Sequence, residues 1–320
     1  METWSVSTFL VCFGGGVVGA AFGALASFIF CGFLILAGCA IVLAGGSDFV
    51  LLQVGLGPVF GPQIGFCGGL AAASYAAGVK KNMASGTGKD ILSPLVDTSW
   101  DVLLVGGVWA VFTHVVQNIL VKIPVISMCD CLALSIIVTT LVARLLFHRE
   151  MPWGNMASIR KLGWLNTDER RLSWVPWMAL PSRIAVIGLG TGILSGALAM
   201  STKEVLDPLL SAGKVSQTAA FVVPLIIGLS FAAISLIGVN FGTGQIQKFP
   251  VWHCQAILSA LAFLHFGSIV AAAVAGVGAG FLQELMARMF YNHGSDHIDP
   301  PATAIAFGTL ILNVVHKVLG

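Results

Sequence analysis

Long apolar stretches run along the whole chain, and short polar segments separate them at 45–48, 80–93, 121–124, 148–182, 201–216, 242–250 and 293–299. A helix needs about 20 apolar residues to cross a hydrocarbon core about 30 Å thick. No polar break separates the first two stretches, so residues 6–45 fit either one bent span or two. The pattern predicts about ten transmembrane helices, at approximately 6–24, 25–45, 60–80, 95–120, 125–147, 183–200, 217–240, 251–269, 271–292 and 300–320.

The composition agrees with a chain that lies almost wholly in lipid. Hydrophobic residues make up 57% of the 320, charged residues make up 9%, and the mean hydropathy is +0.94. Soluble domains carry about 25% charged residues, so this chain has too little polar surface to cover a water-soluble fold. We expect an all-α integral membrane protein of the cell membrane. Its expected partners are the lipid bilayer and a small-molecule or ion substrate, and a homo-oligomer is compatible with this picture.

Charge and cysteine usage exclude several other classes of protein. The net charge of +2 is small and dispersed, which argues against a nucleic-acid partner. The seven cysteines are scattered through apolar stretches without a Cys-x-x-Cys pair, so neither a disulfide framework nor a zinc ribbon is expected. The segment 86–90 lacks the spacing of a phosphate-binding P-loop, and no nucleophile, base and orienting residue form a catalytic set. We therefore expect no enzyme activity, no cofactor and no resident metal.

Basic residues predict the orientation of the spans. They gather in two polar segments, 80–93 and 148–182, which two predicted spans separate. Cytoplasmic loops carry an excess of Lys and Arg, so both segments are expected in the cytoplasm and both termini outside. The segment 148–182 also contains four tryptophans, which suits a linker that lies in the membrane interface. The basic residues are Lys80, Lys81 and Lys89 in the first segment, and Arg144, Arg149, Arg160, Lys161, Arg170, Arg171 and Arg183 in and around the second.

An internal repeat is visible when Asp97 is placed on Asp296 without gaps. The same alignment puts residues 114–117 on 313–316, and the predicted topology gives the matched spans the same direction. The sequence therefore predicts two parallel four-helix repeats joined by a two-helix connector, and solute sites often lie at the interface of such repeats. The expected division is residues 1–120 for the first repeat, 121–200 for the connector with its cytoplasmic linker 148–182, and 201–320 for the second repeat.

The polar segment before the last predicted span is the most distinctive one. Pro300 and Pro301 suit a first helical turn and Asp299 can cap its free amides, so a capped helix start is one interpretation. In a second interpretation, the helix starts that follow Asp97 and Asp296 face each other between the repeats and attract an anion.

A metal site is a third interpretation of the same segment. His293 and His297 are suitable ligands, together with a carboxylate of Asp296 or Asp299. An i, i+4 spacing brings the two imidazoles together only on a helix, and the prolines indicate that the helix begins later. A divalent-metal transporter is therefore kept as an alternative function.

Two short segments resemble a known family of membrane proteins. The stretch Asp299-Pro300-Pro301-Ala302-Thr303-Ala304 is similar to the signature of the HPP family of four-span proteins, in which a His-Pro-Pro motif opens the last helix of the unit. Here Asp299 stands in place of the histidine. The stretch Pro62-Gln63-Ile64-Gly65 resembles that family's Pro-Arg-Asn element. The resemblance implies a fused tandem repeat of the four-span unit and a function in anion transport, notably of nitrite.

Polar side chains inside the predicted spans form the candidate substrate site. Hydrocarbon penalises each of them by a few kcal/mol, so they should face the bundle interior, for interhelical hydrogen bonds or for solute binding. Pro58 and Pro62 would break an ordinary span, which predicts either a broken helix lining a cavity or an external loop. The candidate residues are Asp97, Asp101, Asp296, His297, Asp299, Pro300, Gln63, His114, Gln117, Asn313 and His316.

Together these features favour a secondary transporter or channel for a small polar solute, an anion rather than a cation, with its pathway between the two repeats. Asp101 and Asp130 are the carboxylates closest to hydrocarbon and are candidates for carrying a coupling proton. A non-transporting subunit or anchor of a larger complex is the first alternative, and the divalent-metal transporter is the second.

Overall fold

The structure, a computed structural model that describes residues 2–165 and 172–319, consists of helices and loops, with no strand in those residues. Arg170 and Arg171 of the predicted linker lie outside the described residues. The first half forms α1 (Val6–Phe22), α2 (Ala24–Leu43), η1 (Val50–Gly55), α3 (Gly65–Tyr75), η2 (Ala76–Lys80), α4 (Trp100–Leu120), η3 (Ile126–Met128), α5 (Cys131–Ala143), η4 (Arg144–His148) and α6 (Met156–Leu162). The second half forms α7 (Pro181–Ser211), α8 (Gln217–Ser235), α9 (Ile237–Phe241), α10 (His253–Phe266), α11 (Ile269–Met286), η5 (Ala287–Tyr291) and α12 (Pro300–Leu319).

Each of the ten predicted spans is a helix in the structure. Gly23, with a φ of +86°, separates α1 from α2, so residues 6–45 form two helices and not one bent helix. Seven helices of the described chain are long and apolar enough to cross a membrane. Helix α10 has 14 residues and α1 has 17, which makes them shorter than a full crossing.

Large apolar side chains cover the outside of the bundle. Val186 on α7, Val270 and Val274 on α11 and Val318 on α12 are each more than two-thirds exposed. Water-soluble monomers rarely carry a continuous apolar surface of this kind. The surface therefore agrees with a protein that is surrounded by lipid.

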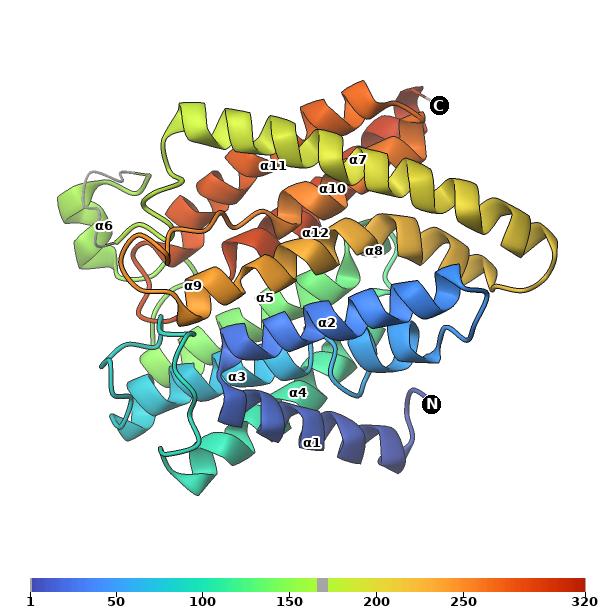
Figure 1. Cartoon of the computed structure of the whole chain (residues 1–320). Helices are drawn as coiled ribbons and strands as arrows, with labels where there is room; N and C mark the ends of the chain where they lie inside the picture. The colour runs from blue at the N-terminus through green and yellow to red at the C-terminus, as the bar shows by residue number, and fades with distance from the viewer. Residues whose placement is uncertain (1, 166–171, 320) are drawn as a thin grey trace.

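The helices of the two halves pack in the same pattern. Helix α1 lies against α3 and α4, as α7 lies against α10 and α11, and α4 meets α5 as α11 meets α12. The two halves join where α2 packs on α8 and where α5 packs on α12. In Figure 1 helices α1 to α5, in blue and green, lie mostly below the helices of the second half, in yellow to red, whereas α6 lies beside the second half.

Corresponding glycines make the closest helix contacts in each half. A methyl group added at Gly16 on α1 would meet the carbonyl oxygen of Gly106 on α4. A methyl group added at Gly188 on α7 would likewise lie 2.7 Å from the carbonyl oxygen of Gly276 on α11. Small residues at these crossings let the helix backbones touch.

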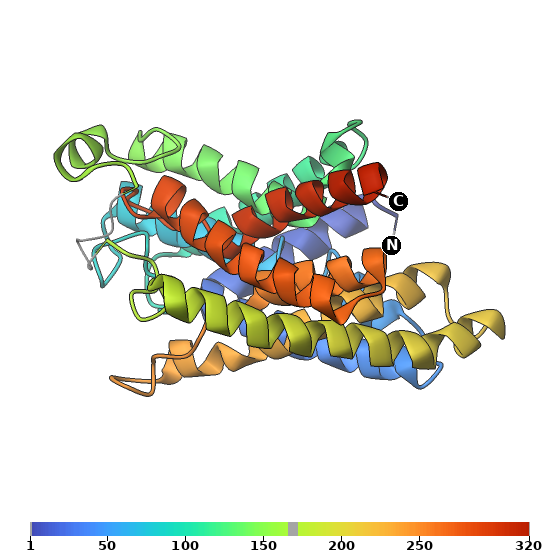
Figure 2. The same ribbon diagram turned by 90° about the horizontal axis from the view of Figure 1, so that it is seen from above.

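The two halves run in opposite directions through the bundle. One end, here called the linker end, holds α6 and the loops 81–99 and 292–299, whereas both termini lie at the opposite, terminal end (Figures 1 and 2). Helix α1 runs toward the linker end and its counterpart α7 runs away from it. The two predicted basic loops do lie at one end, as expected, since Lys89 on the first donates to the carbonyl oxygen of Asn292, which adjoins the linker.

The predicted parallel relation of the repeats is wrong. It required α8 and α12 to pack together as α1 and α4 do, but α8 packs on α2, α7 and α10, and in the described residues it has no comparable contact with α12. The repeat is instead inverted, and the described residues of each half contain five main helices. The sequence alignment indicated a parallel repeat because Asp97 and Asp296 both precede helices that leave the linker end. These helices, α4 and α12, are not counterparts.

The short helices α3 and α10 begin inside the bundle. Before α3, the chain at Val59 and Ile64 lies against Gly15, in the middle of α1. Before α10, the carbonyl oxygen of Val251 accepts a hydrogen bond from the Gln283 side chain on α11. Both helices are therefore preceded by irregular backbone inside the protein, which agrees with the broken-helix interpretation of the segment with Pro58 and Pro62.

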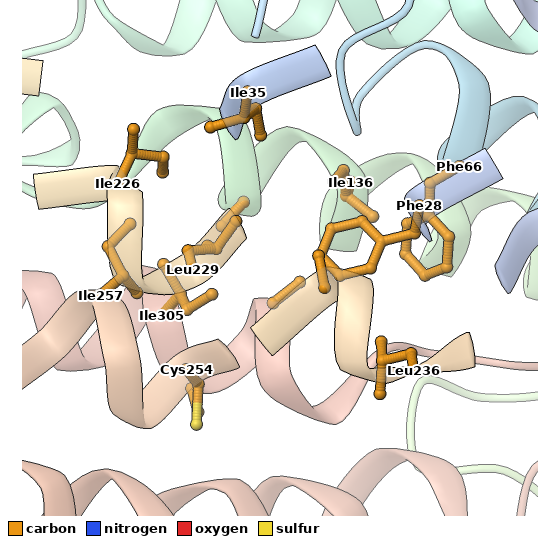
Figure 3. Close-up of a cluster of buried hydrophobic side chains, with 14 of the residues drawn as sticks. Phe28, Ile35, Phe66, Ile136, Ile226, Leu229, Leu236, Cys254, Ile257 and Ile305 are labelled. Carbon is orange, nitrogen blue, oxygen red and sulfur yellow. The ribbon is translucent and has the colours of Figure 1, made fainter. Parts of the chain in front are cut away.

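The central hydrophobic core lies between the two halves. Figure 3 shows Phe28 and Phe66 beside each other, with Ile136 from α5 near them. Side chains of α8, α10 and α12 complete the cluster from the other half. This core surrounds the polar groups described next.

Candidate functional site

A cavity of about 180 Å³ opens between the two halves toward the linker end. Its walls are mainly apolar and include Phe28, Phe66 and tryptophans of the segment that follows α6. Besides Gln247, five titratable side chains converge on it, and a few polar groups in an apolar wall are the usual composition of a small-molecule site. The five titratable side chains are Lys89, His253, Tyr291, His297 and Asp299.

A second, narrower cavity of about 60 Å³ continues from the first toward the terminal end. Phe28, Phe66, His253 and Asp299 line both cavities, so these four side chains form a ring where the two meet. At its other end the narrow cavity reaches Asp130. The two cavities thus adjoin each other in the middle of the bundle, with these four side chains between them.

Corresponding residues of the two halves line the narrow cavity. Asp299 caps α12 by accepting the amide of Ala302 at 2.8 Å. Asp130 caps α5 in the same way, by accepting the amide of Ala133 at 2.9 Å. Both aspartates and both alanines line the cavity, followed one turn later by Ile136 and Ile305. The start of α5, and not that of α4, is therefore the counterpart of the start of α12, which corrects the expected pairing.

Two imidazoles offer nitrogen atoms to the wider cavity. The Nδ1 atoms of His253 and His297 are buried and have no hydrogen-bond partner in the described part of the chain. His297 Nε2 lies 3.2 Å from Asp299 Oδ1. The His253 ring packs against Phe28, with ring centres 4.9 Å apart. Buried polar groups are normally satisfied, so two free nitrogens beside a cavity indicate a site for a solute or for water.

Lys89 places a cation at the wall of the wider cavity. Its ammonium group donates to the carbonyl oxygen of Asn292 at 2.9 Å and lies 4.5 Å from the ring centre of Tyr291. Burial and the nearby Arg144 guanidinium lower the pKa of Lys89 to about 8. The lysine belongs to the loop between η2 and α4, which has no equally long counterpart between α10 and α11.

A buried ion pair closes the linker end next to this cavity. Arg144 is fully buried and donates from Nε to Asp296 Oδ1 at 2.6 Å. Its two terminal nitrogens donate to backbone carbonyl oxygens of Pro152, Phe290 and Asp296. Ser74 donates to the other carboxylate oxygen of Asp296 at 3.0 Å. This network ties α3 and η4 to the loop before α12, so Asp296 has a partner and is not free for a solute.

Of the predicted site residues, His297, Asp299 and Pro300 lie together at the wall of the cavities or next to it. Asp97 lies exposed in a loop, and Asp101 is bonded to Lys80 at 2.9 Å and to Tyr75. Asp97 and Asp101 therefore do not join Asp296 in one site, because their loop and helix start lie outside the bundle centre.

The remaining predicted residues make contacts outside the two cavities. His114 bonds the carbonyl oxygen of Thr3 at 3.0 Å, and Gln63 is buried with its amide donating to Leu56. Asn313 bonds His265 at 2.8 Å, and His316 stacks on the same ring. These side chains thus have hydrogen-bond or ring partners away from the cavities. Gln117 is half-buried on α4 near the terminal end.

The predicted metal ligands point to different partners. His293 Nδ1 pairs with Ser158 Oγ at 2.9 Å and its Nε2 faces the carbonyl oxygen of Gly163, so its ring is turned toward the linker. His297 instead faces Asp299. Among the described residues, no group of three or more His, Cys, Asp or Glu side chains could hold a metal ion.

Sequence reasoning missed His253, Lys89 and the partner of Asp296. His253 is a polar residue at the start of an apolar helix, three residues after Pro250, and that pattern was the available signal. Lys89 and Arg144 were used only as indicators of orientation. Nothing in the spacing of Arg144 and Asp296, which lie in different halves, indicates their contact.

The comparisons with known proteins agree with the duplication. No curated protein and no solved structure matches the chain. One family model, described as a family of unknown function (DUF7973), matches twice, over residues 1–162 and over residues 160–320. These boundaries give two equal units and differ from the expected division at 120 and 200. Because the two matches cover the whole chain, it belongs to that family and contains its unit twice.

Proposed function

We propose that the protein is a membrane transporter or channel for a small polar solute, an anion rather than a cation, with its pathway at the interface of the two inverted repeats. The observation that carries this proposal is the pair of cavities that meet at His253 and Asp299 between the halves. A structural anchor has no need of two free imidazole nitrogens beside such a path.

The inverted repeat supports a carrier. In several secondary transporters, inverted repeats surround a central site, and helices that begin inside the membrane present their ends to it. Helices α3 and α10 begin in this way, and the two cavities meet beside their first turns at Phe66 and His253. Exchange of conformation between the two halves would open the path to each side in turn.

The charges around the wider cavity favour an anion. Lys89 contributes a positive charge, and no side chain caps the first turn of α10, whose free amides carry partial positive charge. The Asp299 carboxylate faces the same space, but its oxygens are bonded to Ala302 and to His297. The resemblance of residues 299–304 to the HPP family adds the same expectation.

Flux measurements with purified protein in proteoliposomes test the proposal. Labelled nitrite, nitrate, chloride and formate are compared with the cation rubidium and with urea. We expect protein-dependent flux of at least one of the anions, severalfold above that of empty liposomes and of rubidium. If none of these solutes moves, the proposal is wrong. A stable stoichiometric partner in the purified protein would then favour the non-transporting subunit.

A matched pair of variants tests whether the solute passes through the narrow cavity. Ala302→Leu adds three carbons in the narrow cavity and is expected to reduce flux at least tenfold. Ala275→Leu adds the same three carbons in a groove on the outer face of α11 and should leave flux unchanged. Equal flux in the two variants would show that solute does not pass through the narrow cavity.

A further inference from the structure

The ring between the two cavities contains one base that can exchange protons with both. Lys89, Tyr291 and His297 line only the wider cavity, whereas His253 and Asp299 line both. Asp299 already accepts the Ala302 amide on one oxygen and faces His297 with the other. His253 has a buried Nδ1 with no partner in the described residues.

The other elements packed around His253 add few charges. Helix α2 presents Phe28, α3 presents Phe66, and α8 presents Leu229 to the same space. From α5 the titratable group is Asp130, at the far end of the narrow cavity. Tyr291 and Lys89 face the wider cavity from η5 and from the loop before α4.

The charged groups around the wider cavity determine how an additional charge is compensated there. With neutral imidazoles, the positive Lys89 and the negative Asp299 offset each other around the wider cavity. An anion that enters the ring adds one uncompensated negative charge, which is costly in a cavity with apolar walls. A proton on His253 would remove that excess at the point where the two cavities meet.

We propose that the solute anion moves together with one proton, which His253 carries across the ring. This inference rests on the proposed transport function and names the coupling ion. A proton from water at one side forms an N–H bond at His253 Nδ1, and the anion binds against the resulting imidazolium. After exchange of conformation, the anion leaves and the N–H bond breaks to water at the other side. One positive and one negative charge have then moved, so the step is electrically neutral.

A pH gradient across proteoliposomes tests this coupling with the same labelled anions, nitrite, nitrate, chloride and formate. For one proton per anion, an outside more acidic by one pH unit should drive about tenfold accumulation of a transported anion, because a tenfold ratio of concentrations balances a tenfold ratio of protons. Valinomycin with equal potassium on both sides holds the membrane potential at zero and should not change the accumulation. Empty liposomes correct for diffusion of the protonated acids.

His253→Gln is the diagnostic variant, and His148→Gln is its matched control. His148 also has a buried ring nitrogen without a partner in the described chain, but it lines neither cavity. We expect loss of gradient-driven accumulation in His253→Gln and full accumulation in His148→Gln. The wild-type result does not depend on how well a variant folds.

The possible outcomes separate the two proposals. Anion flux in the wild type without accumulation under the pH gradient would overturn the coupling and leave the transport function standing. Accumulation that persists in His253→Gln would remove His253 as the proton carrier. Absence of flux for all four anions would overturn the transport function and this inference with it.

Discussion

The two ends of the bundle have the same helices but different chemistry. At the linker end, Arg144 on η4 binds Asp296 and holds the loop before α12. At the terminal end, Asn313 follows Asp299 by as many residues as Arg144 follows Asp130, and it donates to the carbonyl oxygen of Met128 at 2.7 Å. The same contact between α5 and α12 is therefore charged and enclosed at one end and neutral at the other.

The loops account for most of the difference. The linker end has the long segment 81–99 between η2 and α4, which brings Lys89 to the wider cavity. At the terminal end α10 and α11 are joined by only two residues. The duplicated helices thus provide the cavities and their symmetric caps, whereas the unequal loops provide the charge beside the wider cavity and close one end.

The largest expected effect comes from breaking the charged contact. Arg144→Leu leaves Asp296 buried without its partner, which should lower the free energy of unfolding by about 3–5 kcal/mol. Thermal unfolding of the purified protein in detergent measures the loss. The double variant Arg144→Leu with Asp296→Leu should recover part of it, because no unpaired charge remains.

Two control variants test whether burial and charge cause the large loss of stability expected in Arg144→Leu. Asp207→Asn breaks the exposed pair with Lys203 and should change stability by less than about 1 kcal/mol. Asn313→Leu removes the neutral contact at the terminal end and should cost about 1–2 kcal/mol. If Asn313→Leu cost as much as Arg144→Leu, the charge and burial of the contact at the linker end would add no stability over the neutral contact at the terminal end.

Substitution of the glycines at the helix crossings should lower the stability equally in both halves. Gly16→Ala and Gly188→Ala each place a methyl group against backbone of the neighbouring helix, so each should cost about 1–3 kcal/mol in unfolding free energy. Gly14→Ala and Gly190→Ala add the same methyl where no atom lies within 4 Å, and should cost nothing. A tolerated methyl in one half only would contradict the equivalence of α1 with α7.

Much of this fold could be predicted from the sequence, because apolar length is a local property. All ten predicted segments are helices, and Asp299 caps α12 as its place before Pro300 indicated. The direction of the repeat could not be predicted in this way. The match between Asp97 and Asp296 reflects two loops at the same end, and only the packing of α7 on α11 reveals the true counterpart of α1 on α4.

The candidate site could be predicted only in part, for a related reason. His297 and Asp299 were found because they stand in one short polar segment. His253 and Lys89 reach the same cavity from segments far away in the chain. Their convergence depends on long-range packing, which hydrophobic periodicity does not encode.

The pH dependence of stability should expose the charge that the loop 81–99 contributes. Burial lowers the pKa of Lys89 to about 8 from an ordinary 10.5, so above pH 8 the folded state gives up a proton that the unfolded chain keeps. The contribution of Lys89 to the free energy of unfolding then rises with pH, by up to about 1.4 kcal/mol per unit between these two values. Measured as the difference between the wild type and Lys89→Met, the free energy of unfolding should show a rise on the order of 2 kcal/mol from pH 7.5 to pH 9.5. Lys81→Met, which alters an exposed side chain of the same loop, should keep the rise.

The smallest effects should come from the two symmetric caps. Removing either cap, in Asp130→Ala or Asp299→Ala, should cost about 1 kcal/mol in unfolding free energy. Asn caps a helix as well as Asp, so Asp130→Asn should be nearly neutral. Asp299→Asn keeps the cap but weakens the bond to His297, and a double-mutant cycle with His297→Ala should yield a coupling of about 1 kcal/mol. Equal losses in Asp130→Asn and Asp299→Asn would mean that the imidazole adds nothing at the linker end, and the two caps would then be energetically equivalent.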